Sequence, residues 1–275
     1  MRFSQVDVFS GTSYRGNPLA VVHDAEGLPE EDLARFANWT NLSETTFLLP
    51  PTVPGADYRV RIFTVTEELP FAGHPTLGSA RAWLAAGGVP ASEGVVVQEC
   101  GAGLVPVRYA DSHLAFAAPP FLRSGPVDPS DLDRIARALR IDPGQIRHSQ
   151  WIDNGPGWVG VVLASAEEVL ALRPDFAAFD GLDIGVIGPH GPGGPADYEV
   201  RAFVPGLGAT EDPVTGSLNA GFGVWLTGAG LAPTSFTVRQ GTALGRAGDV
   251  TLSVEGDQVW VGGQATVMIS GEIRF

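Results

Sequence analysis

Two predicted helices begin with the same pattern, a polar residue followed by proline: His74-Pro75 and Asp212-Pro213. Proline is favoured at the first helical position, because an N–H there has no acceptor within the helix. The residue before it is then expected to cap the helix. Aspartate is a common cap, so a purely structural cap is one interpretation of Asp212. Histidine is a poor cap, which favours a chemical role for His74.

Glu44 is the third candidate for chemistry. It lies between a predicted helix, residues 28–39, and an apolar run that starts at Thr45. Side chains at such junctions often point into a site. If apolar residues enclose it, its carboxyl group can both accept and donate a proton near neutral pH. An exposed loop carboxylate is the alternative interpretation.

The starts of the two helices also predict a place for an anion. Backbone N–H groups in the first helical turn lack intrahelical acceptors and lie at the positive end of the helix dipole. The segments concerned are residues 76–79 and 215–217. A small molecule that carries a carboxylate fits such groups, with His74 and Asp212 beside it to hold or deliver a proton.

Composition removes several other classes of enzyme. The 275 residues include no lysine, and all 17 basic residues are arginine. Schiff-base aldolases, pyridoxal-phosphate enzymes and Walker A nucleotide sites need a lysine amine and are therefore excluded. Cys100 is the only cysteine, so neither a two-cysteine racemase pair nor a thiolate metal cluster is possible. His23, His113, His148 and His190 show no metal-binding spacing, and no metal site is expected.

The charge of the chain argues against two kinds of partner. With 31 acidic and 17 basic residues the formal net charge is −14, whereas nucleic acids and anionic membrane surfaces both attract a basic face. No run approaches the roughly 18 apolar residues of a membrane span. The N-terminus lacks the apolar segment of a signal peptide. We therefore expect a cytoplasmic protein that binds neither nucleic acid nor membrane.

Short apolar runs separated by glycine and proline predict a mixed α+β chain, rich in strands. Helices are expected at residues 28–39, 75–86, 128–139, 166–172 and 213–227. Strands are expected at residues 6–9, 19–22, 45–49, 58–65, 94–98, 104–109, 114–117, 159–163, 183–187, 198–204, 236–239, 250–254, 258–262 and 265–275.

The two halves of the chain repeat the same order of motifs. His74-Pro75 and Gly78-Ser79 correspond to Asp212-Pro213 and Gly216-Ser217 at a constant offset of 138. Trp83-Leu84 corresponds to Trp225-Leu226 at an offset of 142, so the second helix is expected to be about one turn longer. Chance similarity of two glycine-rich helices is the alternative, but the shared order favours an internal duplication.

Each half is expected to form a lobe in which a curved sheet surrounds a central helix. The helix at 75–86 has Arg81 as its only charged residue, and the helix at 213–227 has none. Helices so poor in charge are buried on nearly all sides. The proline-rich segment 118–126 predicts an N-terminal lobe of residues 1–120 and a C-terminal lobe of residues 121–265, with a cleft between them. The strand at 266–275 can pair with the N-terminal lobe or with the C-terminal lobe.

Four segments resemble the PhzF family of phenazine-biosynthesis isomerases. They are residues 16–21 (GNPLAV), 41–47 (NLSETTF), 70–78 (PFAGHPTLG) and 211–217 (EDPVTGS). The resemblance implies the diaminopimelate epimerase fold, with two similar lobes and the site between them. In those epimerases two cysteines form the acid–base pair. This chain departs from them there, because its only thiol is Cys100.

The resemblance also implies roles for individual residues. Glu44 matches the glutamate that moves a proton between carbons on one face of the substrate. His74 and Asp212 match residues that hold the polar groups of the substrate and assist the transfer. Gly73, Gly216 and Ser217 match the backbone cradle. The best-known member isomerises a hydroxylated dihydroanthranilate as a homodimer without metal or organic cofactor, and the same is expected here.

The leading hypothesis is a cofactor-independent isomerase that moves a proton between carbons of a small carboxylated substrate, of the trans-2,3-dihydro-3-hydroxyanthranilate isomerase type. A non-catalytic binding protein that kept the epimerase-like cleft is the alternative. Incubation with candidate ligands in deuterated water separates the two, since only an enzyme exchanges carbon-bound hydrogen. A hydrolase with Ser43 or Ser217 as nucleophile is disfavoured, because neither lies in a Gly-x-Ser-x-Gly elbow.

Overall fold

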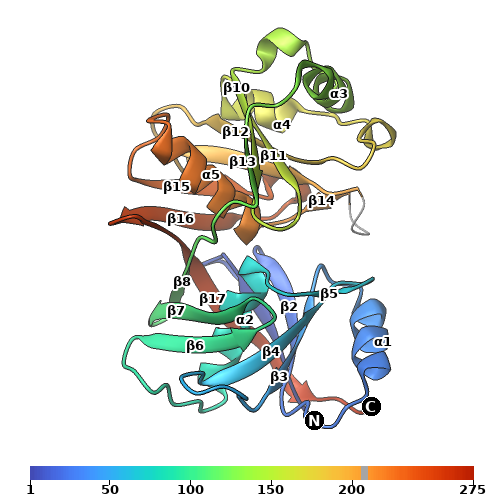
Figure 1. Cartoon of the computed structure of the whole chain (residues 1–275), viewed down its shortest axis with the longest axis vertical. Coiled ribbons are helices and arrows are strands. Elements are labelled where there is room, and N and C mark those ends of the chain that lie inside the picture. The colour runs from blue at the N-terminus through green and yellow to red at the C-terminus, as the bar shows by residue number, and fades with distance from the viewer. Residues whose placement is uncertain (206–209) are drawn as a thin grey trace. The chain divides into compact units, whose positions relative to one another are not determined.

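The computed structural model describes residues 1–205 and 210–275, which divide into two compact units (Figure 1). The first unit comprises Met1–Ala117 together with Gly262–Phe275, and the second comprises Ala118–Val261. Both units are mixed α+β structures, as the sequence predicts. None of the helices in these ranges has the length and apolar character needed to cross a bilayer.

The first unit contains helices α1 (Glu30–Thr40) and α2 (Gly73–Ala85). Its strands are β1 (Arg2–Val8), β2 (Asn17–Val22), β3 (Thr45–Leu49), β4 (Tyr58–Phe63), β5 (Glu68–Leu69), β6 (Val95–Cys100), β7 (Gly103–Ala110) and β8 (His113–Ala117). The long strand β17 (Gln258–Glu272) joins them from Gly262 onward.

The strands of the first unit close into a ring. β17 pairs with β1, and pairing continues through β2, β3, β4, β6, β7 and β8, which pairs with β17 again. The β2–β3 and β4–β6 pairs are parallel. The β17–β1, β1–β2, β3–β4, β6–β7 and β7–β8 pairs are antiparallel. Closure leaves no free sheet edge within this ring.

Helix α2 runs inside the ring and forms its core. It contacts β1, β2, β3, β6, β7 and β8, and most of its residues are buried. Gly78 is required for this close approach, because a Cβ there would lie 2.5 Å from a methyl carbon of Leu19. Burial thus explains why Arg81 is the only charged residue of α2, as the sequence predicts.

The second unit contains helices α3 (Pro129–Leu139), α4 (Ala166–Ala171) and α5 (Gly216–Gly228), and 3-10 turns at Pro143–Gln145, Phe176–Ala178 and Thr242–Leu244. Its strands are β9 (Arg123–Gly125), β10 (His148–Asp153), β11 (Trp158–Val162), β12 (Asp183–Pro189), β13 (Tyr198–Phe203), β14 (Glu211–Asp212), β15 (Ser235–Gln240) and β16 (Gly248–Glu255).

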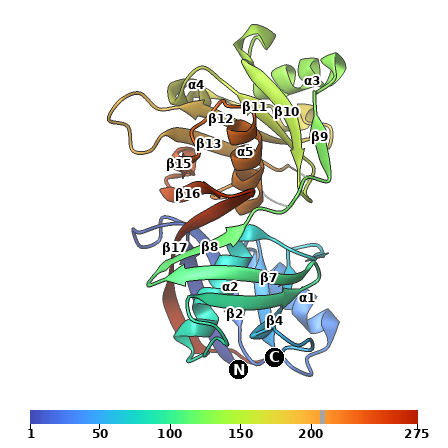
Figure 2. The ribbon, with the colours of Figure 1, turned by 60° about the vertical axis from the view of Figure 1, so that its left-hand side comes forward.

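The main sheet of the second unit has the order β9-β10-β11-β12-β13-β15-β16, with parallel pairing at β11–β12 and β13–β15. Helix α5 packs against β10, β11 and β16 on the inner side of this sheet (Figure 2). A second hydrophobic cluster, which includes Val159 and Ile184, lies under α3.

The two units repeat one topology. The series β1-β2-α1-β3-β4-β5-α2-β6-β7 corresponds in order and strand direction to β10-β11-α4-β12-β13-β14-α5-β15-β16. Even a side-chain pairing is repeated: Arg61 Nε lies 2.7 Å from Glu68 Oε1, and Arg201 Nε lies 2.9 Å from Glu211 Oε1. The sheet registers therefore support the duplication that the motif order predicts.

Several predicted boundaries are wrong. Strand β10 and the short strands β5, β9 and β14 were not expected, and the two runs expected at 258–262 and 265–275 form the single strand β17. Helix α2 begins two residues before the predicted start, and α5 begins three residues after it.

Candidate functional site

Glu44 and His74 lie together at the start of α2. His74 Nδ1 is 3.2 Å from Glu44 Oε2, and the side chains are only 4% and 16% exposed. The end of α1 delivers Glu44: Asn41 adopts a left-handed conformation after the helix, and β3 begins at Thr45. Glu44 is thus not an exposed loop carboxylate, which was the alternative interpretation.

The imidazole of this pair is neutral. Burial lowers the pKa of His74 to about 3, and the hydrogen bond with the Pro18 backbone acts in the opposite direction. At neutral pH the ring therefore carries one proton, and it faces both the Pro18 carbonyl and the Glu44 carboxylate. His74 is therefore not the group of this pair that takes up a proton near neutral pH.

His74 does not precede the helix, as the predicted start at Pro75 required. Ala72, with extended backbone, precedes the first helical residue Gly73, so His74 and Pro75 both lie within the first turn. Pro75 is tolerated there because the N–H groups of the first turn have no intrahelical acceptor. The backbone N–H groups of Gly73 and His74 belong to the same set, and the helix dipole favours negative charge beside them.

The loop between β1 and β2 supports this site. In the sequence, only the GNPLAV segment indicates a role for this loop. The Asp7 carboxylate accepts hydrogen bonds from the backbone N–H groups of Arg15 and Gly16, at 3.1 and 2.9 Å. Gly16 admits no side chain, because a Cβ would lie 2.2 Å from the Val8 carbonyl oxygen. These contacts fix the position of Pro18, whose carbonyl faces His74.

Asp212 is not a helix cap either. It lies on β14, four residues before α5, and the residue that precedes the helix is Thr215. The Thr215 hydroxyl donates to Asp212 Oδ2 at 2.6 Å, and Gln240 Nε2 donates to Thr215 Oγ1 at 2.9 Å and to the Asp212 carbonyl at 3.1 Å. A network anchored on β15 therefore holds Asp212, which spacing along the chain could not reveal.

Ser217 lies in the first turn of α5. Its Oγ accepts a hydrogen bond from Trp158 Nε1 at 3.0 Å, and its carbonyl accepts one from Asn154 Nδ2 at 2.9 Å. Helix α5 has no side-chain cap, so the backbone N–H groups of Gly216 and Ser217 have no acceptor within the helix. The sequence analysis missed both Trp158 and Asn154.

The candidate residues are thus placed in two sets. Gly73, His74 and Glu44 belong to the first unit, whereas Asp212, Gly216 and Ser217 belong to the second. Over residues 1–205 and 210–275, no group of three or more His, Cys, Asp or Glu side chains could hold a metal ion.

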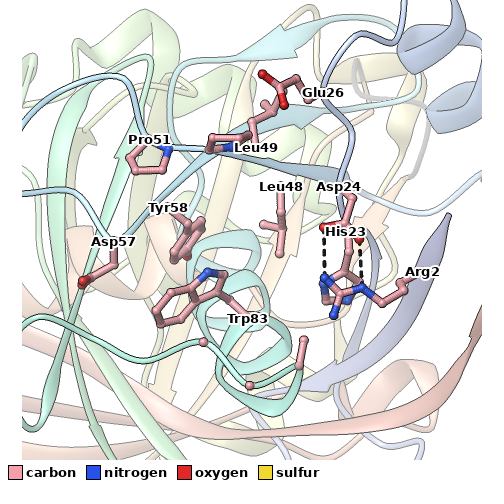
Figure 3. A pocket seen from close by; sticks show the side chains of 14 residues that line it. Arg2, His23, Asp24, Glu26, Leu48, Leu49, Pro51, Asp57, Tyr58 and Trp83 are labelled. Carbon is pink, nitrogen blue, oxygen red and sulfur yellow. Dashed lines mark hydrogen bonds and ion pairs between the residues drawn. The ribbon is translucent and has the colours of Figure 1, made fainter.

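A cavity of about 570 Å³ opens at the C-terminal end of α2, away from its first turn (Figure 3). The stacked rings of Tyr58 and Trp83 form one wall, and the Arg2–Asp24 ion pair lies across another. No candidate residue from the sequence analysis lines it.

Comparison with protein families gives a match over nearly the whole chain. Residues 6–271 match the PhzC-PhzF model, described as phenazine biosynthesis-like protein. The chain is 37% identical to antisense-enhancing sequence 1 of Schizosaccharomyces pombe, over 98% of this chain and 97% of that protein. It is 33% identical to the trans-2,3-dihydro-3-hydroxyanthranilate isomerase of Pseudomonas aeruginosa, over 93% of this chain and 91% of that enzyme.

Solved structures agree with this match. A PhzF family protein of Enterococcus faecalis superposes with a TM-score of 0.82 at 27% identity, over 100% of this chain and 99% of that one. A hydroxyproline epimerase of Agrobacterium vitis shares the fold, with a TM-score of 0.58 at 15% identity, over 98% and 91% of the two chains. The predicted epimerase-like fold is therefore confirmed.

Proposed function

Because the chain belongs to the PhzC-PhzF family of phenazine biosynthesis-like proteins and is an isomerase, we propose that it moves a proton between two carbons of a small carboxylated molecule. The proposed substrate class is a hydroxylated dihydroanthranilate, since trans-2,3-dihydro-3-hydroxyanthranilate is the substrate in the name of one relative. The proposal includes catalysis without metal or organic cofactor, and a homodimer, as the family resemblance implies.

The observation that carries this proposal is the contact between Glu44 and a neutral His74. The Glu44 side chain is only 16% exposed, and its Oε2 lies 3.2 Å from Nδ1 of the imidazole. Burial keeps that imidazole uncharged by lowering the pKa of His74 to about 3. The pair therefore supplies one proton acceptor with a positioned partner, which is what general acid–base catalysis requires.

In the proposed reaction the Glu44 carboxylate removes a proton from one carbon of the substrate. The electron pair of the broken C–H bond forms a new double bond, and the adjacent double bond shifts its electrons to a further carbon. Protonated Glu44 then returns the proton to that carbon. Substrate and product have the same atoms and the same number of electrons, so no co-reactant is needed.

We assign the remaining candidates on the basis of the family resemblance. Gly73, Gly216 and Ser217 are proposed to bind substrate through their backbone N–H groups, with the starts of the two helices receiving the carboxylate. Asp212 is proposed to hold a polar group of the substrate, with its carboxylate oriented by Thr215. His74 is proposed, like Asp212, to hold a polar group of the substrate and to assist the proton transfer.

The test is the substitution Glu44→Gln, assayed with trans-2,3-dihydro-3-hydroxyanthranilate. One positioned acid–base group contributes about 10²–10⁴-fold in rate, so kcat is expected to fall at least about 100-fold while binding is kept. Glu93→Gln, an exposed glutamate before β6, is the matched control and should retain full activity.

The same reaction run in deuterated water separates an isomerase from a binding protein. The wild-type protein is expected to place deuterium on carbon, and Glu44→Gln is expected to lose this exchange. Unchanged turnover in Glu44→Gln would refute the assigned role. Binding without exchange by the wild-type protein would favour the non-catalytic alternative.

A further inference from the structure

We propose that Trp158 is a positioning residue: its indole orients the Ser217 hydroxyl and so makes the proposed substrate site selective for a carboxylate. The inference rests on the proposed function, because it takes Ser217 as part of the substrate site. It adds a residue, Trp158, and a physical reason for the choice of ligand.

The strand β11 places Trp158 beside α5. Its neighbour on the same face, Gly160, faces α5, because a Cβ there would lie within 3.0 Å of Phe222 and Trp225 ring carbons. Side chains two residues apart point to the same side of a strand. Trp158 is only 2% exposed, and its Nε1 lies 3.0 Å from Ser217 Oγ.

The chemistry of the two groups determines the hydrogen-bond direction. An indole N–H can only donate, so Ser217 Oγ must accept in this contact. The hydroxyl hydrogen then has to point elsewhere, and no group in the described part of the chain accepts it. Ser217 is partly exposed. Its hydroxyl is therefore left as a donor for a ligand.

Asn154 reinforces this arrangement from the loop between β10 and β11. Its side-chain amide donates to the Ser217 carbonyl at 2.9 Å. The Asp153 carboxylate accepts from the backbone N–H groups of Gly155 and Gly157, each at 2.8 Å, and so holds the loop in place. Ser217 is thus restrained through both its hydroxyl and its backbone.

A ligand group that meets such a serine must accept hydrogen bonds. A carboxylate presents only acceptors, whereas a carboxamide presents an NH₂ group that has to be matched by an acceptor. Without the Trp158 N–H, the Ser217 hydroxyl could turn and accept from that NH₂. The Trp158 N–H occupies one of the two acceptor sites of the Ser217 oxygen, so the amide NH₂ can use only the other and the hydroxyl hydrogen is directed at the ligand, which disfavours the amide.

The experiment measures the dissociation constants of 3-hydroxyanthranilate and of 2-amino-3-hydroxybenzamide, its carboxamide, by calorimetry. The wild-type protein is expected to prefer the acid, so the dissociation constant of the amide divided by that of the acid is above one. Trp158→Phe is expected to reduce this ratio about tenfold, which is the effect of one hydrogen bond to a charged group. A general loss of packing weakens both compounds alike and leaves the ratio unchanged.

Two further variants complete the design. Trp225→Phe removes another indole, stacked on Phe222 within α5, and should leave the ratio as in the wild type. Ser217→Ala should lower the ratio as Trp158→Phe does, and Trp158→Phe added to Ser217→Ala should change it no further. If Trp158→Phe does not fold, benzothienylalanine at position 158 keeps the shape of the ring and replaces the N–H by sulfur.

The outcomes separate this inference from the proposed function. An unchanged ratio in Trp158→Phe or its sulfur isostere, additive effects in the double variant, or a wild-type protein without preference for the acid would each overturn the inference. If the ratio changes as expected but Glu44→Gln retains full turnover, the carboxylate selectivity stands and the catalytic role of Glu44 fails. The reverse pattern leaves the isomerase proposal intact.

Discussion

A histidine next to a carboxylate is often read as a charged pair, but here burial decides otherwise. Desolvation lowers the pKa of His74 to about 3 and outweighs the hydrogen bond with the Pro18 backbone, which raises it. The neutral ring lies 3.2 Å from Glu44 Oε2 but carries no positive charge to balance a carboxylate. At the scale of single residues, the protonation state of the pair is therefore set by enclosure rather than by proximity.

This state predicts the pH dependence of His74 itself. The ring resonances of His74 are expected to show no titration between pH 5 and 9, which NMR spectroscopy with selectively labelled histidine can measure. A midpoint near the ordinary value of 6.5 would contradict the assignment.

A linked consequence concerns stability. The unfolded chain binds a proton at position 74 below about pH 6.5, whereas the folded chain does so only near pH 3. Stability is therefore lost as the pH falls through 6.5. Between pH 6.5 and 5.0 the free energy of unfolding falls by about 2 kcal/mol on this account. In urea unfolding, His74→Gln is expected to lack this contribution to the pH dependence.

At the scale of elements, the duplication identifies a residue equivalent to Glu44. Thr45 pairs with Phe63 across β3 and β4, and Ile184 pairs with Phe203 across β12 and β13. Asp183 thus occupies the place before Ile184 that Glu44 occupies before Thr45. A Cβ at Gly185 would meet Leu218 of α5, so Asp183, two residues earlier, faces the same helix.

Asp183 predicts a stability effect of opposite sign to that of His74. Burial raises its pKa to about 6, above the value of 3.8 expected for an exposed aspartate. Its ionisation in the folded state therefore costs stability as the pH rises from 4 to 6, and that cost persists above pH 6. Allowing for its partial exposure, the cost is about 1–2 kcal/mol.

Asp183→Asn is accordingly expected to raise the melting temperature at pH 7.5 and to leave it nearly unchanged at pH 4. Differential scanning calorimetry at the two pH values measures the difference. Asp257→Asn, in an exposed turn before β17, is the matched control and should have little effect at either pH. A destabilised Asp183→Asn at pH 7.5 would show that Asp183 has a structural partner.

The same elements show what the sequence can and cannot predict. Motif order predicted the duplication and the two central helices, because glycine, proline and apolar periodicity are local properties. The starts of those helices were wrong, because Pro75 lies third in the first turn and because Gln240, far along the chain, holds Asp212 and Thr215. Strand β10 was missed because polar residues interrupt it.

The predicted site could likewise be found only in part. Glu44 and His74 were identifiable because a carboxylate after a helix and a histidine before proline are unusual at such positions. Trp158 and Asn154 were not, because their significance lies in hydrogen bonds to Ser217 that cross about 60 residues of chain. Their residue types alone are typical of core and turn positions.

At the scale of the whole molecule, the net charge of −14 opposes the approach of an anionic substrate. Salt screens such long-range repulsion, with a Debye length of about 10 Å at 0.1 M. We expect kcat/KM for a carboxylated substrate to rise by roughly twofold or more between 20 and 300 mM NaCl, with kcat unchanged. Steady-state kinetics at constant pH measure this, and a fall in kcat/KM would indicate a locally basic approach to the site.

The ring of the first unit is completed by β17, whose pairing residues come more than 140 positions after β8. During synthesis on the ribosome, residues 118–261 emerge before that ring can close. The N-terminal unit must therefore wait, with the β1 and β8 edges unpaired, until the later unit has been made. The residues of the second unit are thus all synthesised before the first unit can be completed, and until then its unpaired strand edges are where aggregation or chaperone binding is expected.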